Sequence, residues 1–239
     1  PAMPEAAVLQ LDRLALIQGS FRLTADWSVA AGDRIAVMGP SGAGKSTLLS
    51  AIAGFLPPSE GRICWQGHDL APVPPGKRPV TILFQDQNLF PHLTVAQNLG
   101  LGLRPDLRLS PEEVQRVATA LDRVGLSGLG DRRPPHLSGG QASRAALARA
   151  LLRARPILLL DEPFAALGPA LRQEMLALLR EVAAETAALV LMVTHDPGDA
   201  LALGAKTAFV AECQVHPPVP SDRLFADPPP ALRAYLGPK

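Results

Sequence analysis

The chain has 239 residues, of which 47% are hydrophobic, enough for one large α/β domain or for a core domain with a smaller insert. Its formal net charge is +1 and no run of Lys or Arg stands out, which argues against a nucleic-acid or anionic-lipid surface. Cys64 and Cys213 form no CxxC pattern, which favours reduced thiols without a metal. No apolar run approaches the ~18 residues that cross a bilayer and no secretory leader is evident, so we expect a cytoplasmic location.

Near-continuous apolar runs predict buried strands along much of the chain. Such runs are typical of parallel sheets in which both faces are covered. The predicted strands are Val8–Leu11, Ile35–Met38, Val80–Phe84, Ile157–Leu160, Leu189–Val193 and Thr207–Val210. The pattern therefore favours an α/β core.

The segment after the second predicted strand carries the first motif. Two glycines five positions apart are followed by a lysine and a hydroxyl residue, and a helix is predicted from Thr47 to Ala53. The motif consists of Gly39, Pro40, Ser41, Gly42, Ala43, Gly44, Lys45, Ser46 and Thr47. Strand, glycine-rich loop and helix in this order predict a phosphate-binding loop.

The chemistry of this loop suits a nucleoside triphosphate. Glycines let the backbone turn its N–H groups inward around phosphates, and the start of the following helix adds a positive dipole end. Lys45 is placed to reach the β- and γ-phosphates, and Ser46 can bind Mg²⁺. We therefore expect ATP and Mg²⁺ as ligands.

Helices are predicted between the strand that ends near Gln85 and the strand that starts at Ile157. Ser110–Glu113 is a capping box with proline at the first helical position, and it opens a helix that runs toward Gly125. A second helix begins near Gly139 and ends before Pro156. A helical insert thus interrupts the nucleotide-binding core.

The second of these helices starts with a second motif. It consists of Leu137, Ser138, Gly139, Gly140 and Gln141. The serine hydroxyl and the glycine N–H groups form another anion-binding helix start, although such a turn alone is explained equally well by helix capping.

Two acidic residues follow the strand Ile157–Leu160. Asp161 and Glu162 stand at its carboxyl end, where α/β sheets bind ligands. Asp161 is expected to hold Mg²⁺, and Glu162 to polarise the attacking water. His195 follows the next strand and is expected to contact the γ-phosphate, although a lone histidine is more often an ordinary core or surface side chain.

In this combination of motifs the chain resembles the ATP-binding subunit of ABC transporters over nearly all of its length. The resemblance implies a P-loop (RecA-like) core, an inserted α-helical subdomain and a small antiparallel β part. It also implies a sandwich dimer, in which Ser138, Gly139 and Gly140 contact the ATP bound by a second copy. Finally, it implies that Gln85 is a catalytic residue that also senses Mg²⁺.

The resemblance divides the chain as one ABC ATPase domain over residues 3–239. Residues 3–86 and 155–215 form the nucleotide-binding core, residues 87–154 the helical subdomain, and residues 216–239 a C-terminal tail. Prolines are expected to break that tail into short pieces.

Finer similarity points to the ATPases of thiamine importers. It is carried by stretches such as His92–Asn98 and Pro169–Met175. This likeness implies uptake of thiamine and its phosphate esters through a partner permease, fed by a periplasmic binding protein, at the cytoplasmic face of the inner membrane. It implies no nucleic acid as partner. The alternatives are an importer of a polyamine or an inorganic oxyanion, a soluble ABC ATPase, and a nucleotide-gated binding protein with little turnover.

The chain departs from the family at one loop. Ala165–Gly168 stands where the family usually has Ser-Ala-Leu-Asp, so Gly168 replaces an aspartate that crosses the dimer interface. Phe21 is a weak candidate for stacking on adenine. For Phe84, Leu89, Phe90 and Leu93, docking of a permease helix and burial inside the helical insert are equally good interpretations.

Overall fold

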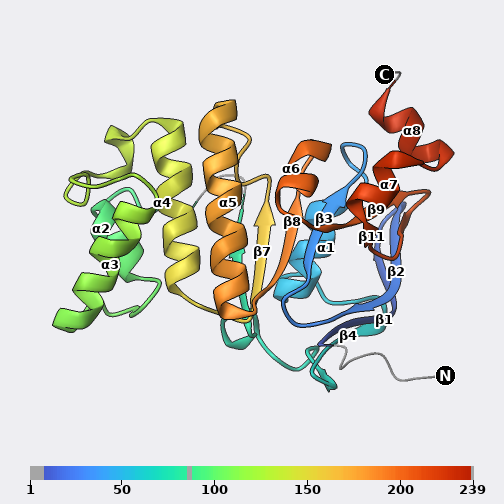
Figure 1. Ribbon diagram of the computed structural model, residues 1–239. Coiled ribbons are helices and arrows are strands. Elements are labelled where there is room, and N and C mark those ends of the chain that lie inside the picture. Colours follow the sequence, from blue (N-terminus) through green and yellow to red (C-terminus); the bar gives the residue numbers. More distant parts are fainter. Residues whose placement is uncertain (1–7, 85–87, 238–239) are drawn as a thin grey trace.

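The fold is built on a parallel sheet that a second, antiparallel part extends at one edge. A computed structural model describes residues 8–84 and 88–237. The parallel strands lie in the order β9 (Lys206–Ala211), β3 (Arg34–Met38), β8 (Leu189–Val193), β7 (Ile157–Asp161) and β6 (Val80–Leu83). Figure 1 shows these strands at the centre of the molecule.

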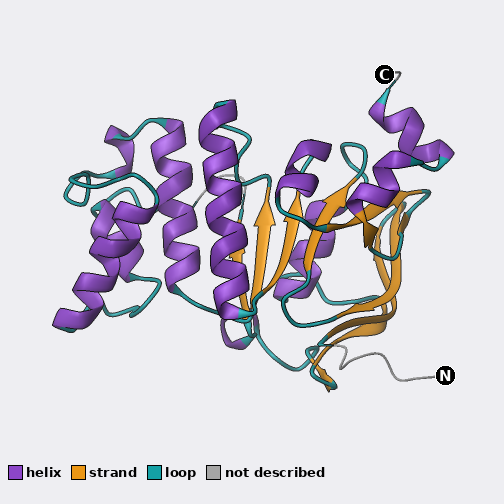
Figure 2. Cartoon of the chain, viewed as in Figure 1, coloured by secondary structure: helices purple, strands orange, loops and turns teal. Residues whose placement is uncertain are grey.

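Further strands continue the sheet beyond β9, and their pairs are antiparallel except that Gln214–Val215 lies parallel to Thr24 and Ala25. The path runs through β10 (Gln214–Val215), β2 (Phe21–Val29), β1 (Leu9–Gln18), β4 (Glu60–Trp65) and β5 (His68–Asp69), and β11 (Val219–Pro220) pairs with β9. The β1 register shifts between Leu11 and Leu14, where Arg13 has φ 45°, and such bulges increase strand twist. The antiparallel part curls away from the parallel core (Figure 2).

Helices cover both faces of the parallel strands and form the insert. The α-helices are α1 (Lys45–Ala53), α2 (Val95–Gly100), α3 (Pro111–Arg123), α4 (Gly139–Leu152), α5 (Pro169–Thr186), α6 (Pro197–Ala202), α7 (Ser221–Ala226) and α8 (Pro230–Leu236). The 3₁₀ turns are Pro75–Lys77 and Pro134–His136. None of the helices in the described ranges is both long and apolar enough to cross a membrane.

The sheet separates two hydrophobic clusters, because successive strand side chains point to opposite faces. In β7, Leu158 and Leu160 join the cluster with α4 and α5, whereas Ile157 and Leu159 join the cluster with α1 and β1. Every residue of β7 is buried. The two covered faces explain why the parallel strands read as continuous apolar runs.

The helix starts that the sequence predicts are confirmed at Ser110 and near Gly139. Ser110 Oγ accepts from the N–H of Glu113 at 3.3 Å, and Glu113 Oε2 accepts from the N–H of Ser110 at 2.8 Å. The strand Leu189–Val193 has the predicted bounds. By contrast, the prediction Val8–Leu11 is too short, since β1 continues to Gln18 beyond its bulge.

Candidate nucleotide-binding and hydrolysis site

The predicted phosphate-binding loop joins β3 to α1. Gly39 and Gly44 have φ 153° and 97°, which L side chains rarely adopt. A Cβ on Gly39 would lie 2.7 Å from the carbonyl oxygen of Val210, and one on Gly44 would lie 2.5 Å from the ring of Phe21. Glycine at both positions therefore allows the loop to pass close to the core and still turn into α1.

Lys45 lies at the first position of α1 and is only 6% exposed. Its Nζ donates to the carbonyl oxygens of Gly39 and Pro40, at 2.8 Å each. Burial lowers the pKa of Lys45, and the nearby carboxylates of Glu162 and Asp161 partly oppose this change. The loop thus holds a desolvated positive charge beside its own backbone, which suits contact with phosphate oxygens.

Ser46 and Asp161 come together although they are far apart in the sequence. Asp161 ends β7 and is 8% exposed. Burial raises the pKa of its carboxyl group, whereas a hydrogen bond with Ser46 and the charge on Lys45 lower it. A hydroxyl and a carboxylate are hard oxygen ligands, which fit Mg²⁺. In the described part of the chain, no group of three or more His, Cys, Asp or Glu side chains could hold a metal.

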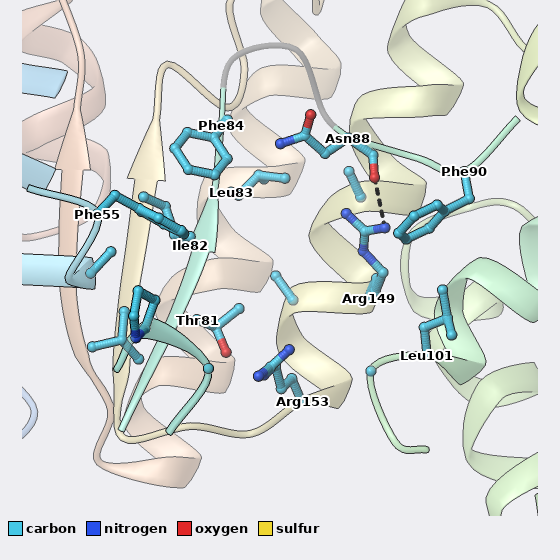
Figure 3. A pocket seen from close by; sticks show the side chains of 17 residues that line it. Phe55, Thr81, Ile82, Leu83, Phe84, Asn88, Phe90, Leu101, Arg149 and Arg153 are labelled. Carbon is cyan, nitrogen blue, oxygen red and sulfur yellow. Dashed lines mark hydrogen bonds between the residues drawn. The ribbon is translucent and has the colours of Figure 1, made fainter. Parts of the chain in front are cut away.

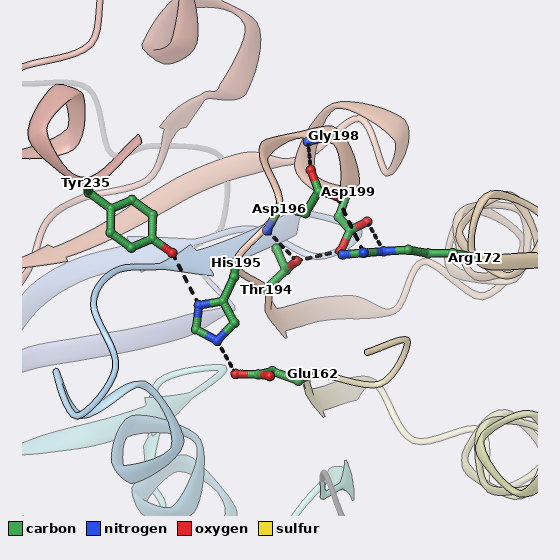
Figure 4. Close-up of polar contacts among 8 residues, drawn as sticks. All are labelled: Glu162, Arg172, Thr194, His195, Asp196, Gly198, Asp199 and Tyr235. Atoms are coloured by element: carbon green, nitrogen blue, oxygen red, sulfur yellow. Dashed lines mark hydrogen bonds and ion pairs between the residues drawn. The ribbon is translucent and has the colours of Figure 1, made fainter. Parts of the chain in front are cut away.

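Glu162 and His195 meet at the carboxyl ends of β7 and β8. His195 Nε2 forms a short hydrogen bond with Glu162 Oε1, and His195 Nδ1 lies 3.2 Å from the hydroxyl of Tyr235 on α8 (Figure 4). Glu162 has a left-handed backbone with φ 48°, which is uncommon for a residue with a side chain. Tyr235 is not among the site residues predicted from the sequence, because no motif surrounds it in the C-terminal tail.

A partly buried ion pair holds the backbone beside His195. Arg172 on α5 donates to both carboxylate oxygens of Asp199 on α6, at 2.7 and 2.5 Å, and Thr194 Oγ1 donates to Asp199 Oδ2. Arg172 also lies 3.5 Å from Asp196 Oδ2. Figure 4 shows Arg172 reaching from α5 to the segment that carries His195. These contacts connect two elements that sequence reasoning treated separately.

The second motif lies on the surface, at the start of α4. Ser138 Oγ accepts from the N–H of Gln141, and Gln141 Oε1 accepts from the N–H of Ser138. The closest groups that a Cβ on Gly139 or Gly140 would meet are Ala166 and Leu167 of the same chain. In Figure 1, α4 and α1 lie on opposite sides of β7. Within one subunit, therefore, Leu137–Gln141 is not brought to the phosphate-binding loop.

Two further predictions have different outcomes. Gln85 lies outside the described residues, so its predicted role stays a prediction. Phe21 is partly buried, packs against the cluster that contains α1, and approaches Gly44 of the loop.

The fold and this site together define an ATP-binding cassette. The profile of the ABC transporter family matches residues 24–165, and the chain belongs to that family. Two curated relatives are named Thiamine import ATP-binding protein ThiQ. The protein from Cereibacter sphaeroides is 67% identical over 97% of this chain and 100% of its own length, and the protein from Ruegeria sp. is 56% identical over 96% and 100%.

Solved structures of similar fold are dimeric cassettes. The cassette MJ0796, described as a bacterial ABC transporter cassette, superposes with a TM-score of 0.77 at 28% identity, over 87% of this chain and 96% of its own. A structure of the same cassette as a dimer bound to ADP and Pi, in a post-hydrolysis state, gives the same values. The predicted P-loop core with an inserted helical part and an antiparallel β part is thereby confirmed.

Proposed function

We propose that this protein hydrolyses ATP to drive uptake of thiamine through a membrane permease. The identity of 67% over 97% of the chain to a thiamine import ATP-binding protein carries the proposal. The geometry of the site supports the ATPase part, since Lys45, Ser46, Asp161 and Glu162 converge at the carboxyl ends of β3 and β7.

Each residue of the site has a role in this proposal. Lys45 exchanges its bonds to the loop carbonyls for bonds to the β- and γ-phosphates of ATP. Ser46 and Asp161 would hold Mg²⁺, which would neutralise phosphate charge. Glu162 accepts the proton of the attacking water, and His195 donates from Nε2 to the γ-phosphate. Gln85 is proposed to orient the water near the metal.

A second copy of the chain completes the site. Ser138 and Gly139 are exposed on this subunit and present a helix start that favours an anion. Because these residues do not meet the phosphate-binding loop of their own chain, we assign their ligand to the ATP of the partner copy. The dimeric cassettes of similar fold support this arrangement.

A groove beside β6 is the proposed docking surface for the permease. It has a volume of about 450 Å³ and lies between β6 and α4, with Phe55, Phe84, Phe90, Arg149 and Arg153 in its lining (Figure 3). Phe55 is 58% and Phe90 is 46% exposed, whereas Leu89 packs against the core. Aromatic rings beside two cationic side chains suit an apolar permease helix that ends in acidic residues.

Reconstitution tests the whole proposal. The chain would be placed in liposomes with a permease and a thiamine-binding protein from the same genome, and uptake of labelled thiamine would be measured with ATP. We expect ATP-dependent uptake by the wild type and none by Glu162→Gln, which keeps the shape of the side chain but lowers hydrolysis by roughly 10²–10⁴-fold. Hydrolysis without thiamine uptake, together with uptake of a polyamine or an oxyanion, would contradict thiamine as the solute.

A charge in the groove tests its role separately. Phe90→Glu is expected to abolish uptake while ATP hydrolysis by the isolated subunit persists, because the groove lies apart from the phosphate-binding loop. The matched control is Val114→Glu on α3, where a residue that is 54% exposed lies outside the groove. Equal uptake by the two variants would exclude this groove as the docking surface.

A further inference from the structure

The C-terminal helices bring a tyrosine to the histidine of the hydrolysis site. The hydroxyl of Tyr235 on α8 lies 3.2 Å from Nδ1 of His195, whose Nε2 bonds to Glu162. Figure 4 shows the three side chains in one line, with the imidazole in the middle. The chain therefore contacts its own hydrolysis site from a segment close to its C-terminus.

The position of Tyr235 is fixed by packing of the tail on β9. β11 pairs with β9, and Ser221 at the start of α7 bonds to Thr207 at 2.7 Å and to the carbonyl oxygen of Ala205 at 2.6 Å. Leu232 of α8 is fully buried, and the rings of Phe209 and Tyr235 have centroids 5.7 Å apart. The tyrosine hydroxyl is thus carried by a helix that packs on the core.

Hydrogen-bonding rules fix the proton on the imidazole. A neutral imidazole has one N–H donor and one acceptor nitrogen, and an ionised carboxylate only accepts. In a neutral imidazole that faces an ionised Glu162, Nε2 carries the proton and Nδ1 accepts from Tyr235. Burial and the charge on Glu162 raise the pKa of Tyr235, so its hydroxyl keeps the proton that it donates.

We propose that Tyr235 is a positioning residue for ATP hydrolysis, which holds the His195 ring in the tautomer whose Nε2–H faces Glu162 in this structure and would turn to the γ-phosphate when ATP is bound. The inference rests on the roles proposed above for Glu162 and His195. The backbone beside His195 is already held by Thr194, Asp199 and Arg172, so the remaining freedom is rotation of the ring. Tyr235 removes that freedom, as a second partner does for other functional histidines.

Tyr235→Phe removes the hydroxyl and keeps the ring that packs on Phe209. Loss of one such bond is expected to lower kcat by about 5- to 30-fold and to leave the KM for ATP unchanged, because the ring meets the phosphate only as hydrolysis proceeds. The matched control is Arg233→Gln on the same helix, an exposed residue that bonds to Pro228 and pairs with Asp227. This control should keep the wild-type kcat.

A double-mutant cycle separates positioning from a merely structural role. In a His195→Ala background, measured by single-turnover hydrolysis of labelled ATP, Tyr235→Phe should lower the rate no further, since its effect passes through the imidazole. An equal decrease in both backgrounds would overturn the proposal, and so would an unchanged or raised kcat of Tyr235→Phe alone. If His195→Ala itself kept the wild-type rate, the proposed role of His195 in hydrolysis would be contradicted. That outcome is distinguishable from one that contradicts only the positioning role of Tyr235.

Discussion

Replacing Gly168 by aspartate tests how the loop after Glu162 is built. Gly168 is the N-cap of the 18-residue helix α5, with φ −66° and ψ 160°, and no side chain caps this helix. A Cβ on Gly168 would meet no atom within 4 Å. The first turn of α5 contains no acidic residue. The site therefore accepts an aspartate without strain and offers it unpaired N–H groups.

The expected gain in stability follows from two contributions. Aspartate in place of glycine at an N-cap adds a few tenths of a kcal/mol through its hydrogen bond. Its negative charge at the start of a helix adds about 0.3–1 kcal/mol. A total near 1 kcal/mol corresponds to a rise in Tm of about 2–4 °C for a chain of this size.

Thermal unfolding followed by circular dichroism measures this gain. Gly168→Asn adds the capping side chain without the charge, so its rise in Tm should be smaller than that of Gly168→Asp. Gly168→Ala offers no hydrogen-bond acceptor and should show no rise in Tm. If Gly168→Asp melted at the wild-type temperature, the description of Gly168 as an open N-cap would be refuted.

Steady-state hydrolysis against ATP concentration, with the permease present, then tests the functional consequence of Gly168→Asp. We expect a higher rate or a steeper dependence on ATP, because the resemblance places an aspartate here at the interface of the two subunits. Coincident curves for a variant of raised Tm would show that the missing aspartate is compensated elsewhere in the dimer.

Three further changes have expected outcomes. Lys45→Ala should weaken ATP binding by about 10²-fold or more, measured by calorimetry, because it removes the charge that faces the phosphates. Unchanged binding would contradict the assignment of this loop as the phosphate-binding site. Arg78→Met should lower the free energy of unfolding by about 3 kcal/mol, which corresponds to a fall in Tm of about 6–12 °C. The reason is that the buried guanidinium donates to four backbone carbonyls. A shift in Tm below 2 °C would contradict that account. Asp199→Asn should cost roughly 1–3 kcal/mol in urea unfolding, because it weakens the charge-assisted bonds of Arg172 and leaves that guanidinium only the longer contact with the carboxylate of Asp196, whereas a neutral result would show that Asp196 or water replaces the pair.

The sequence predicts the parallel core better than the rest of the fold. Continuous apolar runs are an unambiguous signal when both faces of a strand are covered. They place Asp161 and Glu162 correctly at the carboxyl end of β7. β2 alternates between buried and exposed positions, and β4 has three exposed residues before its buried ones. Such half-exposed strands are weak signals for a single sequence.

Contacts between distant segments could not be predicted from the sequence. Arg172 and Asp199 are 27 residues apart on two helices, and their pairing depends on how α5 and α6 pack. The tail was expected to be broken by its prolines. It does consist of the short elements β11, α7 and α8, and Pro230 stands at the first position of α8, where its fixed φ is compatible with a helix start. Proline there begins the helix that carries Tyr235.

The carbonyl oxygens of Gly39 and Pro40 accept hydrogen bonds from Lys45. They therefore compete with a bound phosphate for the ammonium group. The ammonium has three donors, of which these carbonyls take two, so a phosphate that accepts more than one of its hydrogen bonds must displace a carbonyl that belongs to the same loop and is therefore present at high effective concentration. A monophosphate, with few oxygens and little charge, displaces them poorly, whereas a triphosphate offers several oxygens at once. We therefore expect the loop to favour nucleotides with a longer phosphate chain, without any contact to the base.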